Sequence, residues 1–427
     1  MKAPPDPATR SGRRKARSWP HALYAWGRLL GLVIGVSLFL TVSSTLSPVD
    51  TDIAVYWKAA QRVFNQGMDP YLRHPDDVLP FTHPPTALFL VYPFSRLDMT
   101  ESARLILMVN LLLTVALMVL IIGDLSHDDP GRRLIFWGPI YFAAFGGLYL
   151  NLVFCQVNLI VLLFLWLYWR QVRRPRRTWS SGIALAFGCV AKPHYGLLLL
   201  GAGPRPGYRI IAGASIAGVV LLGTSLALAP EGSWKTWVEV VLGETSYTAL
   251  PAGHSSIAAL WNRAIPGAVA RFFVPNKFSG PVVDSPAAAR FLSTVLILVL
   301  LTVSAWTLYR SMRRARREPA DRDLELSMIS VFVFLSSPAS WTHHLVMLLP
   351  AALVMLRDGV LHHTEPIADR LTVGLVLAVI AITFDDLIPR EVRISSLAIM
   401  SLMTIAVVAL WLLIVMRLRR RCGRSEA

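Results

Sequence analysis

A run of acidic, aromatic and histidine residues directly follows the first long apolar segment of the chain. It extends from Asp50 to Pro85, begins with the carboxylates of Asp50 and Asp52, and ends in Phe81-Thr82-His83-Pro84-Pro85. Three- and four-residue spacing predicts one face of a short helix, formed by Asp52, Tyr56, Ala60 and Phe64. A carboxylate at the start of such a helix can accept the proton of an attacking hydroxyl group. Asp52 is therefore our candidate general base and Asp50 the second candidate, with a helix cap as the structural alternative for Asp52.

Two further groups of residues are suited to binding an anion. The adjacent His343 and His344 end the sequence Ser337-Pro338-Ala339-Ser340-Trp341-Thr342-His343-His344. Lys192, followed by Pro193, stands inside an apolar run, where an ammonium group is costly unless it faces a cavity or an anion. Cationic and hydrogen-bonding groups of this kind bind phosphate. The alternative for Lys192 is a side chain that extends to the membrane surface.

The remaining candidates are polar and aromatic residues suited to contacting a bound substrate. His254 opens the sequence His254-Ser255-Ser256-Ile257, and Arg263 follows Asn262 shortly after it. Gln156-Val157-Asn158-Leu159 stands at the head of another apolar run. Rings that can stack against a bound ligand are those of Tyr56, Trp57, Tyr71 and Trp341, and His83 lies in the same loop as the first three. For Trp234 and Trp237 we favour the ordinary place of aromatic residues at a membrane interface.

Composition places the chain among membrane proteins. Apolar residues make up 54% of it and charged residues only 16%, and several apolar runs approach the roughly 20 residues that span a bilayer. The net charge of +16 does not indicate a nucleic-acid partner, because Lys and Arg cluster between apolar runs, at 10–17, 170–177, 310–317 and 417–424. That distribution predicts that these segments, and both termini, are cytoplasmic. The three cysteines have no metal or disulfide spacing, and we expect no essential metal or other cofactor.

The expected fold is an all-α integral membrane protein with about 10–12 spans, an even number because both termini share one side. A disordered basic arm over 1–21 and a basic tail over 417–427 flank a polytopic domain over 22–416, in which 47–83 is the first outer loop and 230–290 a second outer region. The predicted spans are 22–46, 105–122, 134–150, 152–169, 179–201, 210–228, 291–309, 324–335, 345–356, 371–384 and 394–416. The run 84–97 is a half-span or a re-entrant segment, and Pro193 makes 179–201 either one span or a hairpin.

One consequence follows if the basic segments are cytoplasmic. The first outer loop, the 230–290 region and the turn at 336–344 then all fall on the same, non-cytoplasmic side. Ionisable and aromatic residues from distant parts of the chain converge there, beside backbone that is irregular. Because irregular backbone at a membrane is tolerated where it is buried or lines a cavity, the pattern predicts a functional site on that side.

In this order the motifs resemble those of glycosyltransferase family 87, the bacterial polyprenyl-phosphate-mannose-dependent α-1,2-mannosyltransferases of the GT-C superfold. The similarity covers about Asp50 to Pro350. In that family the first outer loop reads roughly D-x3-Y…G-x-x-x-Y…F-T-Y-P-P, and the late turn reads S-P-x-S-W-x-H-H. This chain departs from the pattern at His83, where the family usually has Tyr, at Cys155, where a Gly commonly precedes the Gln, and at His254, which replaces an Asn or Asp.

The resemblance implies a GT-C-type helical bundle whose active site lies on the outer face of a bacterial inner membrane and contains the histidine pair. It implies transfer of a hexose, mannose, from a polyprenyl-phosphate sugar to a hydroxyl of a glycolipid or polysaccharide. The reaction it implies is an inverting single displacement on a β-linked donor, which gives an α-1,2 product. On this reading the polar and aromatic candidates contact the sugar donor or its acceptor. Such a donor expels a phosphate, which needs no strong general acid, so one carboxylate can suffice.

Two alternatives stay open at this point. The same scaffold can transfer arabinofuranose or glucose instead of mannose. A polytopic transporter or flippase of lipid-linked sugars predicts internal repeats and charged residues near the bilayer midplane, flanked by broken helices. Lys192-Pro193 fits a transporter, whereas the gathering of Asp52, His254 and His343 at one face fits an enzyme better.

Overall fold

The computed structural model describes residues 33, 52–72, 77, 79–173, 178–203, 207–244, 246–247, 257–276, 280–314, 317–383, 387–388 and 396–424. In this part of the chain the structure is helical, with no strand and one isolated bridge between Asn262 and Trp341. The α-helices are α2 (Ile53–Ala60), α3 (Leu88–Val91), α4 (Met99–Leu125), α5 (Asp129–Ala143), α6 (Gly146–Val153), α7 (Asn158–Val172), α8 (Trp179–Gly188), α9 (Tyr208–Leu228), α10 (Ser233–Glu244), α11 (Ile265–Phe273), α12 (Pro286–Met312), α13 (Pro319–Ser336), α14 (Leu349–Met355), α15 (Ile367–Ala381) and α17 (Leu397–Arg424). Short 3₁₀ segments are η4 (Pro85–Ala87), η5 (Tyr92–Arg96), η6 (Pro193–Ala202) and η7 (Thr342–Leu348), and π-helical segments are η3 (Gln61–Asn65) and η8 (Leu356–Val360).

Five helical segments of the described chain are long and apolar enough to cross a membrane. They are Met99–Leu125, Tyr208–Leu228, Pro286–Met312, Thr342–Val360 and Leu397–Gly423, and a bent pair, Pro130–Ala143 with Gly146–Val153, adds a sixth if it counts as one span. The most apolar window of Thr342–Val360 is 83% buried inside the protein, against 28% for Tyr208–Leu228 and for Pro286–Met312. Thr342–Val360 is therefore central, while the other two present most of their surface outward. The protein is a polytopic helical membrane protein, as composition predicts.

The span count of 10–12 stays a prediction, and several individual spans differ from the expected form. The run predicted over 134–150 is broken at Ala144 and bent by 47° between α5 and α6. The run 84–97 is divided into η4, α3 and η5, which together are too short to cross a bilayer. The interruption expected at Lys192-Pro193 is present, because α8 ends at Gly188 and η6 begins at Pro193. The first span, over 22–46, lies outside the described residues apart from Val33.

The breaks between helices carry the polar residues of the apolar runs. Gln156 stands between α6 and α7, Lys192 stands between α8 and η6, and Trp341 stands between α13 and η7. Non-helical backbone at membrane depth is tolerated where it is buried in protein. Gln156 is 4% exposed, Lys192 is 6% exposed, and Trp341 is partly buried.

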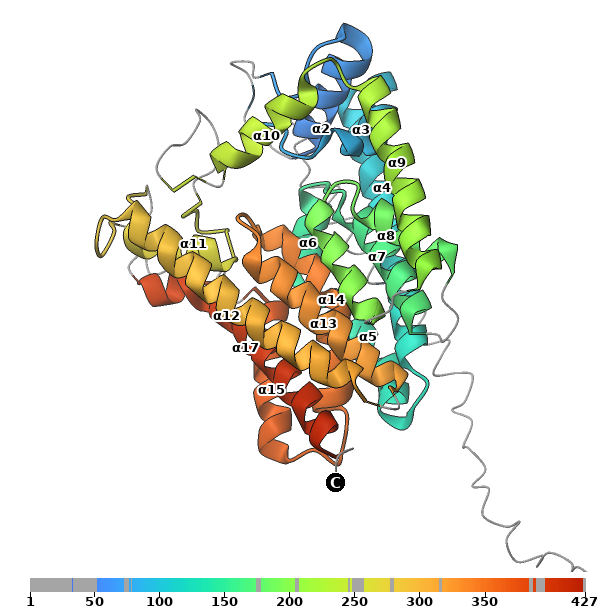
Figure 1. The fold of residues 1–427 in the computed structure, drawn as a ribbon, viewed down its shortest axis with the longest axis vertical. Coiled ribbons are helices and arrows are strands. Elements are labelled where there is room, and N and C mark those ends of the chain that lie inside the picture. The colour runs from blue at the N-terminus through green and yellow to red at the C-terminus, as the bar shows by residue number, and fades with distance from the viewer. Residues whose placement is uncertain are drawn as a thin grey trace, which may run out of the picture.

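The two ends of the helix bundle differ in character. Figure 1 shows α2, α3 and α10 at one end of the molecule, with α15 and the end of α17 at the other. Helix α7 connects them, since Gln156 precedes its first residue and Arg173 follows its last, at a separation of about 22 Å for a 15-residue helix. We call the end with α2 the Asp52 end and the end with Arg173 the basic end.

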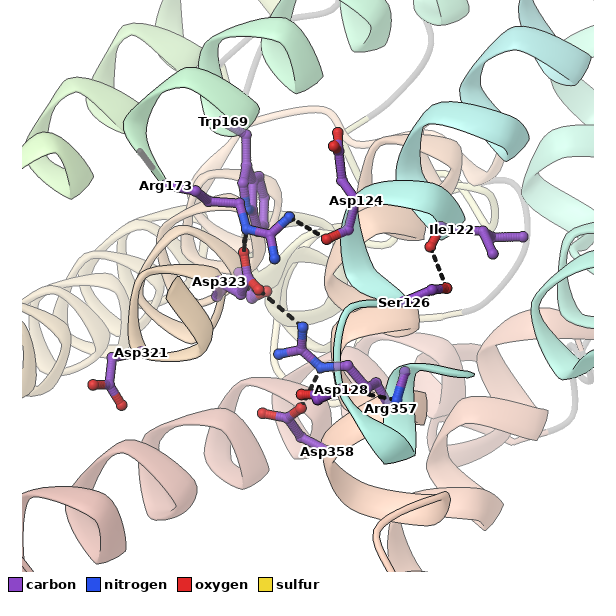
Figure 2. Close-up of polar contacts among 12 residues, drawn as sticks. Ile122, Asp124, Ser126, Asp128, Trp169, Arg173, Asp321, Asp323, Arg357 and Asp358 are labelled. Atoms are coloured by element: carbon purple, nitrogen blue, oxygen red, sulfur yellow. Dashed lines mark hydrogen bonds and ion pairs between the residues drawn. The ribbon is translucent and has the colours of Figure 1, made fainter. Parts of the chain in front are cut away.

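At the basic end, three of the basic segments meet around the start of α13. Arg173 Nε lies 2.9 Å from Asp323 Oδ1, and Arg357 Nη1 lies 3.1 Å from Asp323 Oδ2 (Figure 2). Arg317 pairs with Glu325, and Arg421 pairs with both Asp321 (3.3 Å) and Asp358 (3.0 Å). The fourth basic segment, 10–17, is not among the described residues. Because each buried carboxylate here has an arginine partner, the cluster ties α7, α13, η8 and α17 together.

Candidate active site

Asp52 stands immediately before α2, and its carboxylate is held from a distant part of the chain. Gln156 Nε2 donates a hydrogen bond to Asp52 Oδ2. The Asp52 side chain makes no capping hydrogen bond to α2. The helix cap that is the structural alternative for this residue is therefore not formed, and the carboxylate is available for chemistry.

Gln156 is positioned by the short break between α6 and α7. Its backbone N–H donates to Asn151 O at 3.0 Å, and Asn110 Nδ2 of α4 donates to Gln156 O at 2.9 Å. The preceding residue, Cys155, has φ +51°, in the left-handed region that costs a side chain about 1–2 kcal/mol and that glycine adopts freely. This conformation explains why a Gly suits the position before the Gln, and Cys155 adopts it nonetheless.

Tyr56 and His83 extend the contacts of Gln156. The buried Tyr56 hydroxyl donates to Gln156 Oε1 at 2.8 Å and lies 3.0 Å from His83 Nε2. The two rings are stacked, with centroids 5.5 Å apart and an interplanar angle of 20°. His83 Nδ1 donates to Ala191 O at 3.2 Å, and the Tyr71 hydroxyl donates to His83 O at 2.6 Å. Tyr71 thus supports the loop that carries His83.

Lys192 and the histidine pair form a second group of contacts. Lys192 Nζ lies 3.0 Å from His344 Nε2, and the backbone N–H of Trp341 donates to His344 Nδ1 at 3.2 Å. The rings of His343 and His344 meet edge to face, with centroids 4.5 Å apart. Since Lys192 is 6% exposed, its side chain lies inside the protein and does not extend to the membrane surface.

The two groups join into one closed circuit. The His343 ring contacts Phe154 at 5.6 Å between centroids, and Phe154 is two residues from Gln156. Ala191, which accepts from His83, precedes Lys192 in the chain. In order, the circuit runs through Gln156, Phe154, His343, His344, Lys192, Ala191, His83 and Tyr56, whose hydroxyl closes it at Gln156. Asp52 is attached to the circuit through Gln156. Four segments far apart in the sequence therefore meet at the Asp52 end, as the motifs predict.

Arg263 and Trp341 lie outside this circuit, next to the turn that precedes the histidine pair. Arg263 is 2% exposed, its Nε donates to Thr342 Oγ1 at 3.0 Å, and its backbone N–H donates to Ser340 O at 2.7 Å. Asn262 Nδ2 donates to Pro338 O at 2.9 Å. The Trp341 ring packs against the small apolar cluster that contains Ala259, Leu260 and Met400. Both predicted binding residues thus hold the turn that carries His343 and His344.

A family model described as glycosyltransferase family 87 matches residues 81–338, well over half of the chain. The chain belongs to glycosyltransferase family 87. It is a glycosyltransferase, and the transporter alternative is set aside. Its matched region includes Gln156, Lys192 and the start of the turn that leads to the histidine pair.

Curated relatives of this glycosyltransferase come from mycobacteria. A polyprenol-phosphate-mannose-dependent alpha-(1-2)-phosphatidylinositol mannoside mannosyltransferase of Mycobacterium tuberculosis (strain ATCC 25618 / H37Rv) is 28% identical over 329 residues, which are 73% of this chain and 70% of the relative. The protein of the same name from Mycolicibacterium smegmatis is 26% identical over 65% of this chain and 61% of the relative. A phosphatidylinositol pentamannoside mannosyltransferase of Mycobacterium tuberculosis (strain CDC 1551 / Oshkosh) is 27% identical over 78% of this chain and 72% of the relative. No solved structure matches the chain.

The charge state of the glycosyltransferase site follows from burial. Loss of hydration raises the pKa of Asp52 to about 6, against the smaller lowering effect of the Gln156 hydrogen bond. Burial and the charge of Lys192 lower the pKa of His83 to about 4. At neutral pH, Asp52 is therefore ionised but retains appreciable basicity, and His83 is neutral. No lysine or arginine of the described chain lies within ion-pair distance of Asp52.

The residues that sequence reasoning singled out divide into three groups. The circuit contains Tyr56, His83, Lys192, His343 and His344 and holds Asp52 through Gln156, while Tyr71, Arg263 and Trp341 contact the backbone or side chains next to it. Asp50 and His254 lie outside the described residues. Gln156 was noted in a motif but given no role, although a polar side chain at a break before an apolar run was a signal for one. Among the described residues no group of three His, Cys, Asp or Glu side chains is arranged to hold a metal ion, and the expectation of no metal stays a prediction.

Proposed function

We propose that this family 87 enzyme is a membrane mannosyltransferase that takes mannose from a polyprenyl-phosphate-mannose donor. The observation that carries the proposal is the circuit itself, which holds the carboxylate of Asp52 through Gln156 and also contains Lys192 and the histidine pair, with no lysine or arginine of the described residues paired with Asp52. The names of the mycobacterial relatives support mannose and the polyprenol-phosphate donor. The acceptor is a hydroxyl group of a glycolipid of the phosphatidylinositol mannoside type, and the product linkage is α-1,2.

The reaction is a displacement at the anomeric carbon of the donor. The acceptor oxygen forms a bond to that carbon while the bond from the carbon to the phosphate oxygen breaks. Asp52 takes the hydroxyl proton, and polyprenyl phosphate leaves with the bonding electrons. A general base of this kind contributes about 10²–10⁴-fold to the rate.

Lys192, His343 and His344 are assigned to the donor phosphate. Lys192 supplies a positive charge where burial strengthens electrostatic attraction, His343 supplies a hydrogen bond, and His344 positions Lys192 through the contact of its Nε2 with Lys192 Nζ. The charge and the hydrogen bond both act more strongly on the leaving phosphate, which gains charge as the bond breaks, than on the bound donor. Tyr56 and His83 contact the sugar or the acceptor.

We place the site on the outer face of a bacterial inner membrane, because the basic end carries the Arg-rich segments. Reporter fusions test this placement. A fusion after Arg317 is expected to report the cytoplasm, and a fusion within 230–245 the outer side. An outer location for Arg317 would contradict the placement.

The transfer reaction is tested in membranes that contain the wild-type enzyme or Asp52→Asn at equal expression. Radiolabelled polyprenyl-phosphate-mannose is supplied with phosphatidylinositol mannoside, and the corresponding glucose and arabinofuranose donors are supplied in parallel. We expect label in the acceptor from the mannose donor and a loss of about 10²–10⁴-fold in Asp52→Asn. Transfer from glucose or arabinofuranose in preference to mannose would overturn the choice of sugar, and equal transfer by both proteins would overturn the choice of base.

A further inference from the structure

Gln156 touches Asp52 directly and takes no part in the bond changes described above. Its side chain is 4% exposed and comes from a break between helices that is 104 residues away from Asp52 in the chain. A side chain amide has two donor hydrogens and one acceptor oxygen, so its orientation is set by the groups at each end. The structure gives Gln156 a partner at both ends.

The two partners of Gln156 fix one orientation of the amide. The Nε2 atom faces the carboxylate of Asp52, which accepts hydrogen bonds when ionised, and Oε1 faces the Tyr56 hydroxyl at 2.8 Å, which donates. A flipped amide would point Oε1 at a carboxylate and lose both contacts. The position of the amide is also fixed, because the Gln156 backbone is bonded through its N–H to Asn151 and through its O to Asn110.

The hydrogen bond from Gln156 uses one oxygen of Asp52 and leaves the other. Among the described residues, Asp52 Oδ1 has no hydrogen-bond partner, and the side chain does not cap α2. A carboxylate held at a single oxygen by a rigid donor presents the second oxygen in a defined direction. A general base needs this arrangement, because proton transfer requires a hydroxyl within about 2.6–3.2 Å of the accepting oxygen.

We propose that Gln156 is the positioning residue for the general base, holding Asp52 Oδ2 so that Oδ1 faces the acceptor hydroxyl, with Tyr56 fixing the orientation of the Gln156 amide. This proposal rests on the proposed function, in which Asp52 is the base. It assigns Tyr56 a second task besides any contact with sugar. It also gives the glutamine of the Gln156-Val157-Asn158-Leu159 stretch a role that the motif alone does not reveal.

Gln156 also affects the protonation of the base. A hydrogen bond donated to the ionised form favours that form, and the Gln156 contact lowers the pKa of Asp52 against the opposing effect of burial. Removal of the amide therefore has two effects, a loss of orientation and a higher pKa. A residue that served only to support the fold would produce neither effect per folded molecule.

The test is the pH dependence of kcat/KM for transfer by Gln156→Met, Gln156→Glu and the wild-type enzyme, per folded molecule. We expect Gln156→Met to lower kcat by about 10²-fold through misplacement of the base. We expect its acid limb to lie about one pH unit above that of the wild type. Gln156→Glu keeps the shape but puts a second carboxylate beside Asp52, so its limb is expected to lie higher still. Tyr56→Phe is expected to lower kcat less than Gln156→Met, because the contact of Nε2 with Asp52 survives.

Gln61→Met is the matched control. The Gln61 amide lies in η3 of the same outer loop and donates to Phe94 O at 3.2 Å, without contact to Asp52. We expect this variant to change stability alone and to keep the wild-type pH profile. Gln156→Met with wild-type kcat and an unmoved limb would overturn the proposal, as would a loss in kcat that Gln61→Met reproduces. If wild-type enzyme transfers no mannose, the proposed function fails first. If wild type transfers and Asp52→Asn does not, while Gln156 variants behave as wild type, only the present inference fails.

Discussion

The Asp52 end and the basic end both bury charged groups, but they treat a carboxylate in opposite ways. Asp323 at the basic end lies within 3.1 Å of two arginine side chains, those of Arg173 and Arg357 (Figure 2). Asp52 at the other end is held by the neutral amide of Gln156. Both oxygens of Asp323 are engaged, Oδ1 by Arg173 and Trp169 and Oδ2 by Arg357, so neither is left to accept a proton from a substrate. A carboxylate held by an amide keeps its basicity.

Buried carboxylates near the two ends of α7 therefore have different tasks: the one at the basic end stabilises the fold, and the one at the Asp52 end takes part in the chemistry. Helix α7 begins beside Gln156 and ends at Arg173, so one rigid element connects the two ends. At the basic end the ion pairs fix the relative positions of α7, α13, η8 and α17. The circuit at the Asp52 end is then positioned on a frame whose own charges are neutralised. Substitutions at the Asp52 end should therefore change the rate, and substitutions at the basic end should change the stability.

Asp52→Asn removes the proposed base and is expected to reduce kcat by about 10²–10⁴-fold. The melting temperature should not fall, because the folded protein binds a proton at Asp52 more tightly than the unfolded chain does. Asp77→Asn is the control in the same loop, since Asp77 pairs with Lys58 at 3.1 Å and with Arg62 at 2.5 Å. We expect the control to lower the melting temperature and to keep kcat. Loss of stability without loss of rate in Asp52→Asn would assign that carboxylate to the fold.

Asp323→Asn is expected to lower the stability and to leave the rate unchanged. It leaves Arg173 and Arg357 buried beside a neutral group, and breaking a buried pair in this way costs about 3–5 kcal/mol of folding free energy. The rate per folded molecule should stay near that of the wild type. Denaturation in detergent, with the yield of folded protein and kcat measured on the same sample, checks both statements. Glu239→Gln breaks the exposed pair with Lys235 and should cost less than about 1 kcal/mol. A similar cost for the two variants would show that the basic end does not stabilise the frame.

Lys192→Met tests the donor-phosphate assignment. Loss of a hydrogen bond to a charged group costs about 1.5–3 kcal/mol, which corresponds to roughly a 10- to 150-fold reduction in kcat/KM for the donor. Lys192→Arg, which keeps the charge, should retain more activity than Lys192→Met. Steady-state kinetics with varied donor concentration distinguish the variants. Unchanged kcat/KM for the donor in Lys192→Met would remove Lys192 from the phosphate site.

Cys155→Gly is expected to have the smallest effect. Glycine relieves a left-handed conformation that costs a side chain about 1–2 kcal/mol, but it also increases the entropy of the unfolded chain. The two effects nearly cancel, so the melting temperature and kcat should both lie close to the wild-type values. Cys155→Val places a β-branched side chain in the same conformation and should be clearly less stable. A larger loss for glycine than for valine would show that the thiol, rather than the backbone, matters here.

Sequence reasoning predicted the parts of the fold that depend on local pattern. Long apolar runs predicted the helices α4, α9, α12 and α17, because bilayer thickness sets their length. The interruption at Pro193 followed from the missing N–H of proline. The bend after Ala143 was not predicted, since Gly146 and Gly147 are compatible with a continuous helix and the break depends on packing against other segments.

The sequence points to candidate site residues but not to the contacts among them. Lys192 is a candidate because a charge in an apolar run is costly without a function, whereas Asp52 and the histidine pair are candidates through their motifs and the family resemblance. The hydrogen bond from Gln156 to Asp52 joins residues 104 positions apart, and no local pattern specifies such a pairing. Substrate binding by Arg263 and Trp341 stays a prediction, and local pattern does not specify the contacts through which they support the turn before the histidines.

The most direct test of the central claim, that Asp52 is the base of the site, is the pH dependence of kcat/KM for the wild-type enzyme between pH 5 and 8. Asp52 must be ionised to accept a proton, and its pKa in the folded protein is raised to about 6. With Asp52 as the base, kcat/KM falls about tenfold per pH unit as the pH is lowered below about 6. The donor phosphodiester stays ionised throughout this range, and the pKa of His83, about 4, lies below it. A profile that stays flat down to pH 5 would contradict the assignment of Asp52 as the base.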